Sequence, residues 1–474
     1  MNPLKAAPLA ASILLLTLSL LVPSLSPLTL VALVPYLLFL RSSNFFQNVF
    51  AGLLTGIIFF SVMLYWINLY EIRIFLIVLG ISAPFFVFFS LLTTWAWKKT
   101  EGKFLQPFVP AVSWSTITFF YGLTPVGIIG DQIAMTVAPS FPGIVRMLGI
   151  SGIAFLVLLS NSLVAGWIET RQGGIRNGFF ALALLLLLGT SGKFQLSHPE
   201  PIRVALIQHN FPVSAEWRKT HEEEIVRDYE NAIRNAPKEA ELIVFPQYGL
   251  PRDVLREPEW LQNLAERHRV SILLATYIPK IPGGSLTEGA RTDSALLFSP
   301  GKPVQEYQAM NPPPFRNIGQ IVGRERNPLQ LNERKIGVML CYEDVRPDNG
   351  RSWISSGAEI LVALSNPGHF MGTSLPRYHL LHDRIRAIET GRYVIRVSPN
   401  GFSAVIDPTG KILAQSQLNR PEILTAVVYP SGDRTFFSSA GPWIPPVSTI
   451  ITLGLLIKSR YARDSMIRRA RRRR

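Results

Sequence analysis

Long apolar runs in the first 190 residues limit, more than any other feature, what this chain can fold into. Residues 1–190 are almost free of acidic side chains, and short loops separate their apolar runs. A helix needs roughly 20 apolar residues to cross a bilayer. Stretches that could do so lie at 8–22, 27–40, 45–70, 74–97, 104–122, 144–167, 177–191 and 442–457. The sequence therefore predicts a membrane α-helical bundle of about eight spans, with an N-terminal part at 1–192 and a C-terminal transmembrane helix at 441–458.

Basic residues give these predicted spans an orientation. The net charge is +15, and residues 458–474 hold nine Lys or Arg against one Asp. Such clusters mark cytoplasmic flanks of membrane helices, and the others fall on alternate loops: Lys5, Arg41, Lys98, Lys99, Lys103, Arg171 and Arg176. We therefore expect both termini in the cytoplasm, a basic cytoplasmic tail at 459–474 and the block 200–435 outside. Anionic membrane lipids are expected partners, whereas nucleic acid is not, because no basic-aromatic interleaving accompanies the charge.

The periodicity changes after Pro199 and Pro201. Short β-type runs lie at 202–208, 241–246, 271–276, 293–299, 335–341, 359–364, 393–398, 402–407 and 423–428, and amphipathic helical stretches lie near 217–235, 257–269 and 376–391. This alternation predicts an α/β domain over 200–435 with an antiparallel share. The Cys and His spacing typical of metal ligands does not occur, and we expect neither a metal nor another cofactor.

One stretch of this domain carries the only cysteine of the chain. KIGVMLCYED (335–344) is an apolar β-type run that ends at Cys341, and Tyr342, Glu343 and Asp344 follow at once. A strand that ends in a thiol beside carboxylates can present a nucleophile at a sheet edge. A lone cysteine after Met and Leu is also typical of a small buried hydrophobic residue. The segment alone leaves both interpretations open, although a single cysteine excludes an internal disulfide.

Several phrases around this cysteine occur in the order seen in a known superfamily. They are VALIQHN (204–210), ELIVFPQYGLP (241–251), SILLATY (271–277), ILVALSNPGHF (360–370) and RAIETGRYVIRVSPNGFSAVIDPTG (386–410). With the flanking apolar segments, they resemble the apolipoprotein N-acyltransferase family, a branch of the nitrilase, or carbon-nitrogen hydrolase, superfamily. The resemblance covers essentially the whole chain. It implies a nitrilase-like α-β-β-α sandwich at 200–435, located in the periplasm, and a multi-pass bundle in the bacterial inner membrane.

The resemblance also implies a reaction and its partners. Members of this family transfer an acyl chain from a phospholipid donor to the N-terminal diacylglyceryl-cysteine of a lipoprotein acceptor, through a cysteine thioester. Such a transfer needs a thiolate, a base and a group that stabilises the oxyanion, which the family supplies as cysteine, glutamate and lysine. Cys341 matches the cysteine, and Glu343 matches a supporting acid in the Cys-Tyr-Glu phrase.

Two catalytic positions depart from the family pattern. The phrase that ends in the glutamate base reads FPQ here and ends at Gln247, and the Tyr-x-Lys phrase reads YQA and ends at Ala309. An amide cannot carry a proton away, and Ala309 offers neither charge nor donor. Neighbouring positions differ too, with Arg316 and Asn317 where the family has Gly and Glu, and Pro367 where it has aspartate.

These departures leave two hypotheses. The chain is either an envelope acyltransferase that acts through Cys341, or a catalytically inactive relative that binds lipid or lipoprotein. Substitutes for the missing groups could be His369, His379 or His382 as a base and Arg316 as a cation, although these are equally explained as ordinary surface or helix residues. A transporter is disfavoured because the spans lack buried charges, and a soluble amidase would not need the spans.

Overall fold

The computed structural model describes residues 3–69, 71–100, 102, 104–124, 127, 129–171, 173–189, 200–212, 214–250, 257–280, 290–313 and 319–472. The chain divides into two compact units. Met1–Ser191 and Pro442–Arg474 form one, which we call the helical unit. Gly192–Gly441 forms the other, which we call the sandwich unit.

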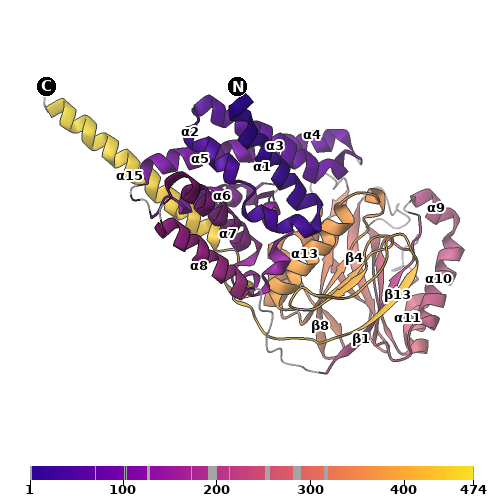
Figure 1. Ribbon diagram of the computed structural model, residues 1–474. Coiled ribbons are helices and arrows are strands. Elements are labelled where there is room, and N and C mark those ends of the chain that lie inside the picture. Colours follow the sequence, from indigo (N-terminus) through magenta and orange to yellow (C-terminus); the bar gives the residue numbers. More distant parts are fainter. Residues whose placement is uncertain are drawn as a thin grey trace. The chain divides into compact units, whose positions relative to one another are not determined.

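Helices make up the described part of the helical unit (Figure 1). In chain order they are α1 (Pro3–Leu21), η1 (Pro23–Leu30), α2 (Val34–Ser42), α3 (Phe45–Asn68), α4 (Ile72–Ser82), α5 (Pro84–Lys99), α6 (Phe108–Gly122), η2 (Ile129–Ala134), η3 (Ala138–Ser140), α7 (Pro142–Thr170), α8 (Gly173–Gly189) and α15 (Ile444–Arg472). Among the described residues, four segments are long and apolar enough to cross a membrane: Pro23–Ser42, Phe45–Asn68, Ile72–Lys99 and Pro142–Thr170. The chain is therefore a membrane protein with an α-helical region, and the count of about eight spans stays a prediction.

The span expected at 27–40 differs from a plain α-helix. It begins as the 3-10 helix η1 and continues, after a break, as α2. Asn161 of α7 bridges the break, because its Oδ1 accepts from Leu33 N at 2.6 Å and its Nδ2 donates to Thr29 O at 2.9 Å. Unpaired backbone groups cost several kcal/mol in hydrocarbon. The buried amide of Asn161 therefore allows an irregular turn at this place.

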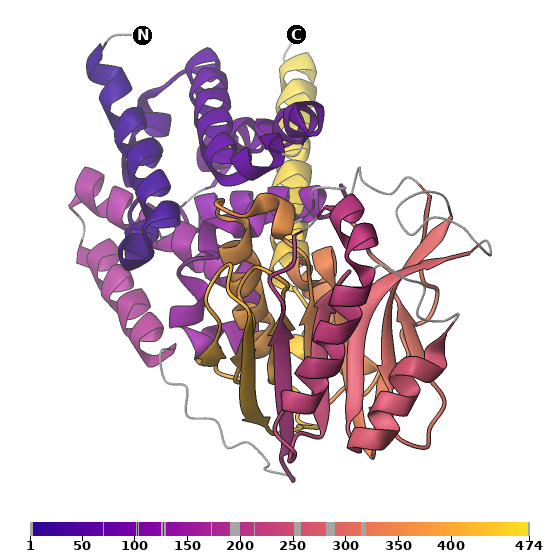
Figure 2. The ribbon, with the colours of Figure 1, turned by 90° about the vertical axis from the view of Figure 1, so that its right-hand side faces the viewer.

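The C-terminal helix is longer than the sequence predicted. We expected it to end at 458 and a separate basic tail to follow, but α15 continues as one helix from Ile444 to Arg472 (Figure 2). Residues 455–474 contain neither Gly nor Pro, and Lys and Arg are good helix formers. The helix is held to α6 by a hydrogen bond between the hydroxyls of Thr116 and Thr452, 2.9 Å apart.

Two β-sheets form the centre of the sandwich unit. The strands are β1 (Ile202–Gln208), β2 (Leu242–Gln247), β3 (Ser271–Pro279), β4 (Arg291–Phe298), β5 (Gln305–Gln308), β6 (Gln320–Ile321), β7 (Leu329–Leu331), β8 (Arg334–Leu340), β9 (Ile360–Leu364), β10 (Val394–Val397), β11 (Ala404–Ile406), β12 (Ile412–Gln415) and β13 (Glu422–Val428). One sheet has seven strands in the order β13-β1-β2-β3-β4-β5, with β6 beside β4, and the other has six in the order β12-β11-β10-β9-β8-β7. Both are mixed, as the sequence predicted.

Helices cover the outer face of each sheet. The helical elements of this unit are α9 (Ala215–Thr220), α10 (Glu222–Asn235), α11 (Pro258–His268), η4 (Cys341–Val345), α12 (Pro347–Ser355), η5 (Gly368–Phe370), α13 (Leu375–Thr390) and α14 (Phe436–Ala440). Along β1, Ala205 and Ile207 pack against α10, whereas Val204 and Leu206 belong to the core between the sheets. Figure 1 shows α13 on one side of the strands and α10 with α11 on the other. The unit is thus the expected α-β-β-α sandwich.

The strand directions bring several chain segments to one edge. β8 and β9 are parallel, and Leu340 pairs with Leu364 at their ends. In the other sheet β2 is parallel to β3, and β3 is antiparallel to β4. The end of β2, the beginning of β4 and the end of β5 therefore meet at a common edge. The predicted site residues lie on these strand ends.

Candidate active site

Cys341 follows the last residue of β8 and opens the single turn η4. Its φ is +49°, in the left-handed region that non-glycine residues rarely adopt. A residue held there costs about 1–3 kcal/mol, and such residues cluster at functional sites. The side chain is half-buried. Cys341 therefore lies in a turn at the sheet edge and is not one of the fully buried residues of the core.

Glu343 is a fully buried anchor for the cysteine turn. Its Oε1 accepts from Met310 N at 2.9 Å and Asn311 N at 3.1 Å, and its Oε2 accepts from Leu340 N at 3.0 Å. The Tyr307 hydroxyl donates to both oxygens, at 2.8 and 3.0 Å. Burial raises the pKa of Glu343, and these donors oppose that shift. The carboxylate fixes the backbone on either side of the site and has the contacts of a positioning residue.

Gln247 ends β2 and points to a carboxylate on another strand. Its Nε2 donates to Asp293 Oδ2 at 2.7 Å, and the Tyr248 hydroxyl donates to the same oxygen at 2.7 Å. Asp293 is only 3% exposed. Burial raises the pKa of Asp293 to about 7, while the bonds from Tyr248 and Gln247 act in the opposite direction. Gln247, which stands where the family pattern has a glutamate, is thus in contact with the carboxylate of Asp293.

Ala309 lies at the same place, directly after β5. Its N–H donates to the backbone oxygen of Asp293 at 2.8 Å, and its side chain is buried. The charge of Arg326 acts on Glu343 and opposes the rise in its pKa that burial causes. The Arg326 guanidinium donates to Asn349 O and Oδ1, both at 3.0 Å. No described residue takes the position of the family's lysine.

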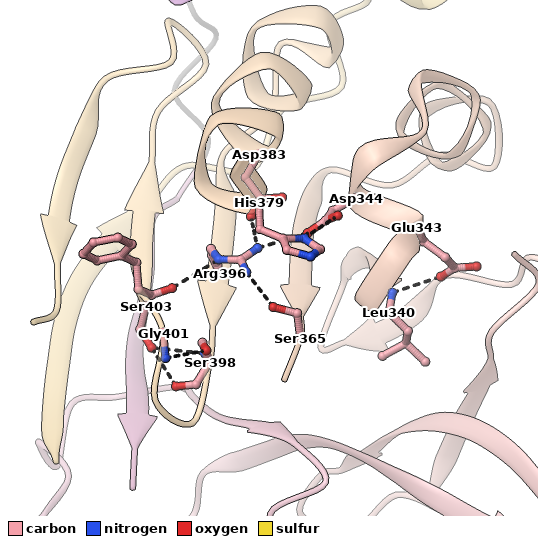
Figure 3. Close-up of polar contacts among 11 residues, drawn as sticks. Leu340, Glu343, Asp344, Ser365, His379, Asp383, Arg396, Ser398, Gly401 and Ser403 are labelled. Carbon is pink, nitrogen blue, oxygen red and sulfur yellow. Dashed lines mark hydrogen bonds and ion pairs between the residues drawn. The ribbon is translucent and has the colours of Figure 1, made fainter. Parts of the chain in front are cut away.

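A buried ionic network holds the cysteine turn from the other side (Figure 3). Arg396 of β10 donates from Nη1 to Asp344 at 3.0 Å and to Asp383 at 2.6 Å, and from Nη2 to Ser365 Oγ at 2.6 Å. His379 Nδ1 lies 2.7 Å from Asp344 Oδ2. Burial opposes ionisation of Asp344, but His379 and Arg396 outweigh it and lower the pKa of this carboxyl. The network ties η4 to α13, β9 and β10.

The described histidines that could have replaced the missing base belong to the surroundings of the ionic network. His379 uses its Nδ1 on Asp344 within the ionic network. His382 is buried on α13, and burial together with Arg386 lowers its pKa to about 3, so the ring is neutral at pH 7. His369 belongs to η5, but its side chain lies outside the described part of the structure, as does the whole of Arg316. The structure gives His379 and His382 structural roles.

Asp293 is the site residue that the sequence analysis missed. It lies in the run TDSALLF, which was assigned only as a strand. Its signal is an acid in the polar first half of a strand, RTDSALLF, in which every residue after the first is buried. The bond to Gln247 joins residues 46 positions apart. Only the sheet order, which a linear pattern does not reveal, brings the two together.

Comparison with known proteins gives two matches that cover different parts of the chain. A model of the carbon-nitrogen hydrolase family matches residues 203–432, and a model of the apolipoprotein N-acyltransferase N-terminal domain matches residues 12–163. The chain belongs to the apolipoprotein N-acyltransferase family. In this family member the first match falls in the sandwich unit and the second in the helical unit.

Individual relatives agree with this assignment. The chain is 27% identical to an apolipoprotein N-acyltransferase of Gloeobacter violaceus over 479 residues, which covers 91% of this chain and 89% of the relative. It is 27% identical to that of Nitrosomonas europaea over 369 residues, 71% of each chain. A carbon-nitrogen hydrolase of Helicobacter pylori is 21% identical with a TM-score of 0.42, covering 49% of this chain and 90% of the other.

Proposed function

We propose that this protein transfers a fatty acyl chain from a phospholipid to the α-amino group of a lipoprotein's N-terminal diacylglyceryl-cysteine, through a thioester on Cys341. The observation that supports it most directly is the left-handed backbone of Cys341 at the end of β8, held by the five hydrogen bonds of Glu343. Strained residues of this kind cluster at functional sites, which favours a working nucleophile over an inactive relative. The relatives named apolipoprotein N-acyltransferase support the same choice.

The reaction has two steps that balance in atoms and charge. In the first, Cys341 Sγ forms a bond to the acyl carbonyl carbon, the thiol proton passes to a base, and the ester C–O bond breaks to release a lysophospholipid that takes up a proton. In the second, the acceptor amine forms a C–N bond to the same carbon, the C–S bond breaks, and the amine proton returns to the thiolate. Because Ala309 provides no cation for the oxyanion, we expect a rate about 100- to 1,000-fold below that of a site with such a partner.

We further propose that the protein lies in the bacterial inner membrane with the sandwich unit in the periplasm and both termini in the cytoplasm. The basic residues on alternate loops and in 458–474 support this orientation. Two reporter fusions test it, one after Arg474 and one in a chain truncated after Pro201. We expect the reporters on opposite sides of the membrane. Finding them on the same side would contradict the proposed topology.

The acyl transfer is tested with purified full-length protein and a phospholipid of one defined acyl chain. Intact-mass spectrometry should show one added acyl group, which hydroxylamine removes and which is absent from the Cys341→Ala variant. Adding a diacylglyceryl-cysteine peptide should discharge the thioester and yield the N-acylated peptide.

A wild-type protein that stays unmodified on a timescale of hours, yet binds the phospholipid, would refute the proposal and favour the inactive relative. An acyl group that persists in Cys341→Ala would place the chemistry on another residue.

A further inference from the structure

The Asp293 carboxylate has two oxygens in different situations. Oδ2 accepts from Gln247 and Tyr248, each at 2.7 Å. Oδ1 is buried without a hydrogen-bond partner among the described residues, and so is Gln247 Oε1. A buried acceptor left without a donor is unfavourable, because it has lost its hydrogen bonds to water. Here the two acceptors belong to side chains that are hydrogen-bonded to each other, and such groups call for an explanation, of which a catalytic role is one.

Tyr248 shares the Asp293 carboxylate with Gln247, and this carboxylate lies next to the cysteine turn. The Ala309 N–H donates to Asp293 O at 2.8 Å, and the next residue, Met310, donates to Glu343 of that turn at 2.9 Å. The Tyr248 hydroxyl donates to Asp293, and its ring stacks on Tyr277 with centroids 4.1 Å apart. Burial raises the pKa of Tyr248, and negative charge on Asp293 and on Cys341 raises it further, so both groups lie within electrostatic range of the phenol. Tyr248 also has a left-handed backbone, with φ of +59°. A strained residue on each side of the site fixes the geometry from Cys341 to Asp293.

Three buried carboxylates lie near Gln247 and Cys341 in the described part of the chain: Asp293, Glu343 and Asp344. Asp344 is engaged by Arg396 and His379, which lower its pKa and leave it a poor proton acceptor. Glu343 already accepts five hydrogen bonds, three of them from backbone N–H groups. Both of its oxygens are therefore occupied by donors, and taking up a proton would break at least one of these hydrogen bonds. Asp293 accepts two and keeps one oxygen open. Glu343 therefore positions the backbone of the site, and Asp293 is the acid that can take up a proton.

We propose that Asp293 accepts the thiol proton of Cys341, relayed by the Tyr248 hydroxyl, in place of the carboxylate that Gln247 lacks. The thiol proton moves to the phenolic oxygen of Tyr248 while the phenolic proton moves to Asp293, which leaves a thiolate and a neutral carboxylic acid. Gln247 is then a positioning residue that holds the carboxyl by its amide. This inference rests on the proposed acyl transfer for its catalytic meaning, but the proton coupling is a property of the protein alone.

The charges around Asp293 set its response to pH. Glu343 and burial raise its pKa, whereas Arg291 and the donors Tyr248 and Gln247 lower it, and the result is about 7. A general base is most effective when its pKa lies near the working pH. An unassisted thiol has a pKa of about 8.5. If Asp293 takes the proton, the reactivity of Cys341 should rise near pH 7, and if the thiol is unassisted it should rise near pH 8.5.

The experiment measures the rate of Cys341 alkylation by iodoacetamide against pH in the full-length protein. Because the chain has one cysteine, the modified mass reports this thiol alone. Wild type should show a rise with an apparent pKa near 7. In Asp293→Asn, an isosteric change, that rise should vanish and leave one near or above 8.5. Tyr248→Phe, which keeps the ring stack, should have the same effect. Glu306→Gln on β5 is the matched carboxylate-to-amide control and should keep the wild-type profile.

A variant that exchanges the acid and the amide between positions 247 and 293 distinguishes loss of the base from a structural effect. Gln247→Glu combined with Asp293→Asn keeps an amide-to-carboxylate hydrogen bond but returns the acid to the end of β2. We expect it to recover the rise near pH 7 and at least a tenth of the wild-type thioester rate, whereas Asp293→Asn alone should lose about 100-fold or more.

Each outcome separates the two proposals. A wild-type profile with a single rise near 8.5 that Asp293→Asn leaves unchanged overturns the inference, even if a thioester forms. A rise near 7 that depends on Asp293, in a protein that forms no thioester, supports the proton coupling and refutes the acyl transfer. Failure of the exchange variant to recover the rise, with its unfolding temperature unchanged, also overturns the inference.

Discussion

Replacing Glu343 by Gln should loosen the backbone around the thiol, although the side chain keeps the same size and shape. The carboxylate accepts N–H groups from Leu340 on one oxygen and from Met310 and Asn311 on the other. In Glu343→Gln, the amide oxygen can serve only one of these sides, and the amide NH2 then faces a donor. We expect Leu340 on one side, or Met310 and Asn311 on the other, to open much more often than in wild type.

The size of this effect follows from the bonds. A buried N–H left unpaired costs about 1–3 kcal/mol, and the bonds that remain lose the benefit of a charged acceptor, about 1 kcal/mol each. The sum of about 3–5 kcal/mol is partly offset because the neutral amide avoids the burial that raises the pKa of Glu343. A net local loss of about 3 kcal/mol corresponds to roughly 100-fold more frequent opening, since about 1.4 kcal/mol is tenfold.

Hydrogen exchange read by mass spectrometry measures this opening directly. Peptides covering 309–311 and 338–341 should exchange on the order of 100-fold faster in Glu343→Gln. Glu359→Gln is the matched control, because its Oε2 accepts from Lys335 N at 3.0 Å at the opposite end of the same strand. That bond is more exposed, and its loss should change exchange at 338–341 less than about threefold. Unchanged exchange at both site peptides in Glu343→Gln would refute the anchoring role.

Three further predictions concern stability of the sandwich unit. Arg396→Met leaves the buried Asp383 without its ion-pair partner and Asp344 with His379 alone, and it should lower the free energy of unfolding by about 3–5 kcal/mol; a loss below about 1 kcal/mol in urea unfolding would contradict this. The pKa of His382 is about 3 when folded and 6.5 ordinarily, so the unfolded state binds more protons between these values and stability falls as pH drops through 6.5. From pH 7.5 to 5 this group should account for about 2 kcal/mol, which His382→Gln should abolish. Cys341→Gly should be about 1 kcal/mol more stable than Cys341→Ala and should unfold at a higher temperature, because only glycine relieves the left-handed backbone; equal temperatures would argue against strain there.

Local patterns predicted the long elements of the sandwich but not the short ones. The run 202–208 is β1 as expected, and 376–391 is α13 to within a residue at each end. β6 and β7 have only two and three residues, too few for any periodicity to register. The 3-10 start of the span at 27–40 depends on an asparagine more than 125 positions away. A linear pattern contains no information on such a partner.

At the site, too, local patterns could be read from the sequence, whereas contacts between distant residues could not. Cys341 and Glu343 could be singled out because they share one short phrase that follows a strand. The histidines near the site could not be judged, since His379 and His382 face a network whose other members come from η4 and β10. Asp293 was missed because a lone acid in a strand has no local partner. Its role depends on which strand lies beside it.

Charge balance gives a physical reason for the combination of residues at this site. A glutamate at the end of β2 and a lysine after β5 would neutralise each other, and here Gln247 and Ala309 remove both charges together. Without a cation, a carboxylate that is always ionised would be an uncompensated buried charge next to Glu343, which is strongly unfavourable. Asp293, with a pKa of about 7, can be neutral when the thiolate forms and charged when the thiol is protonated, so the site need not hold both negative charges at once. Restoring the cation alone with Ala309→Lys should therefore lower the pKa of Asp293 and weaken it as a base. We expect that variant to gain little acylation rate unless Gln247→Glu accompanies it, and a large gain from the single substitution would show that the oxyanion, not the proton, limits the reaction.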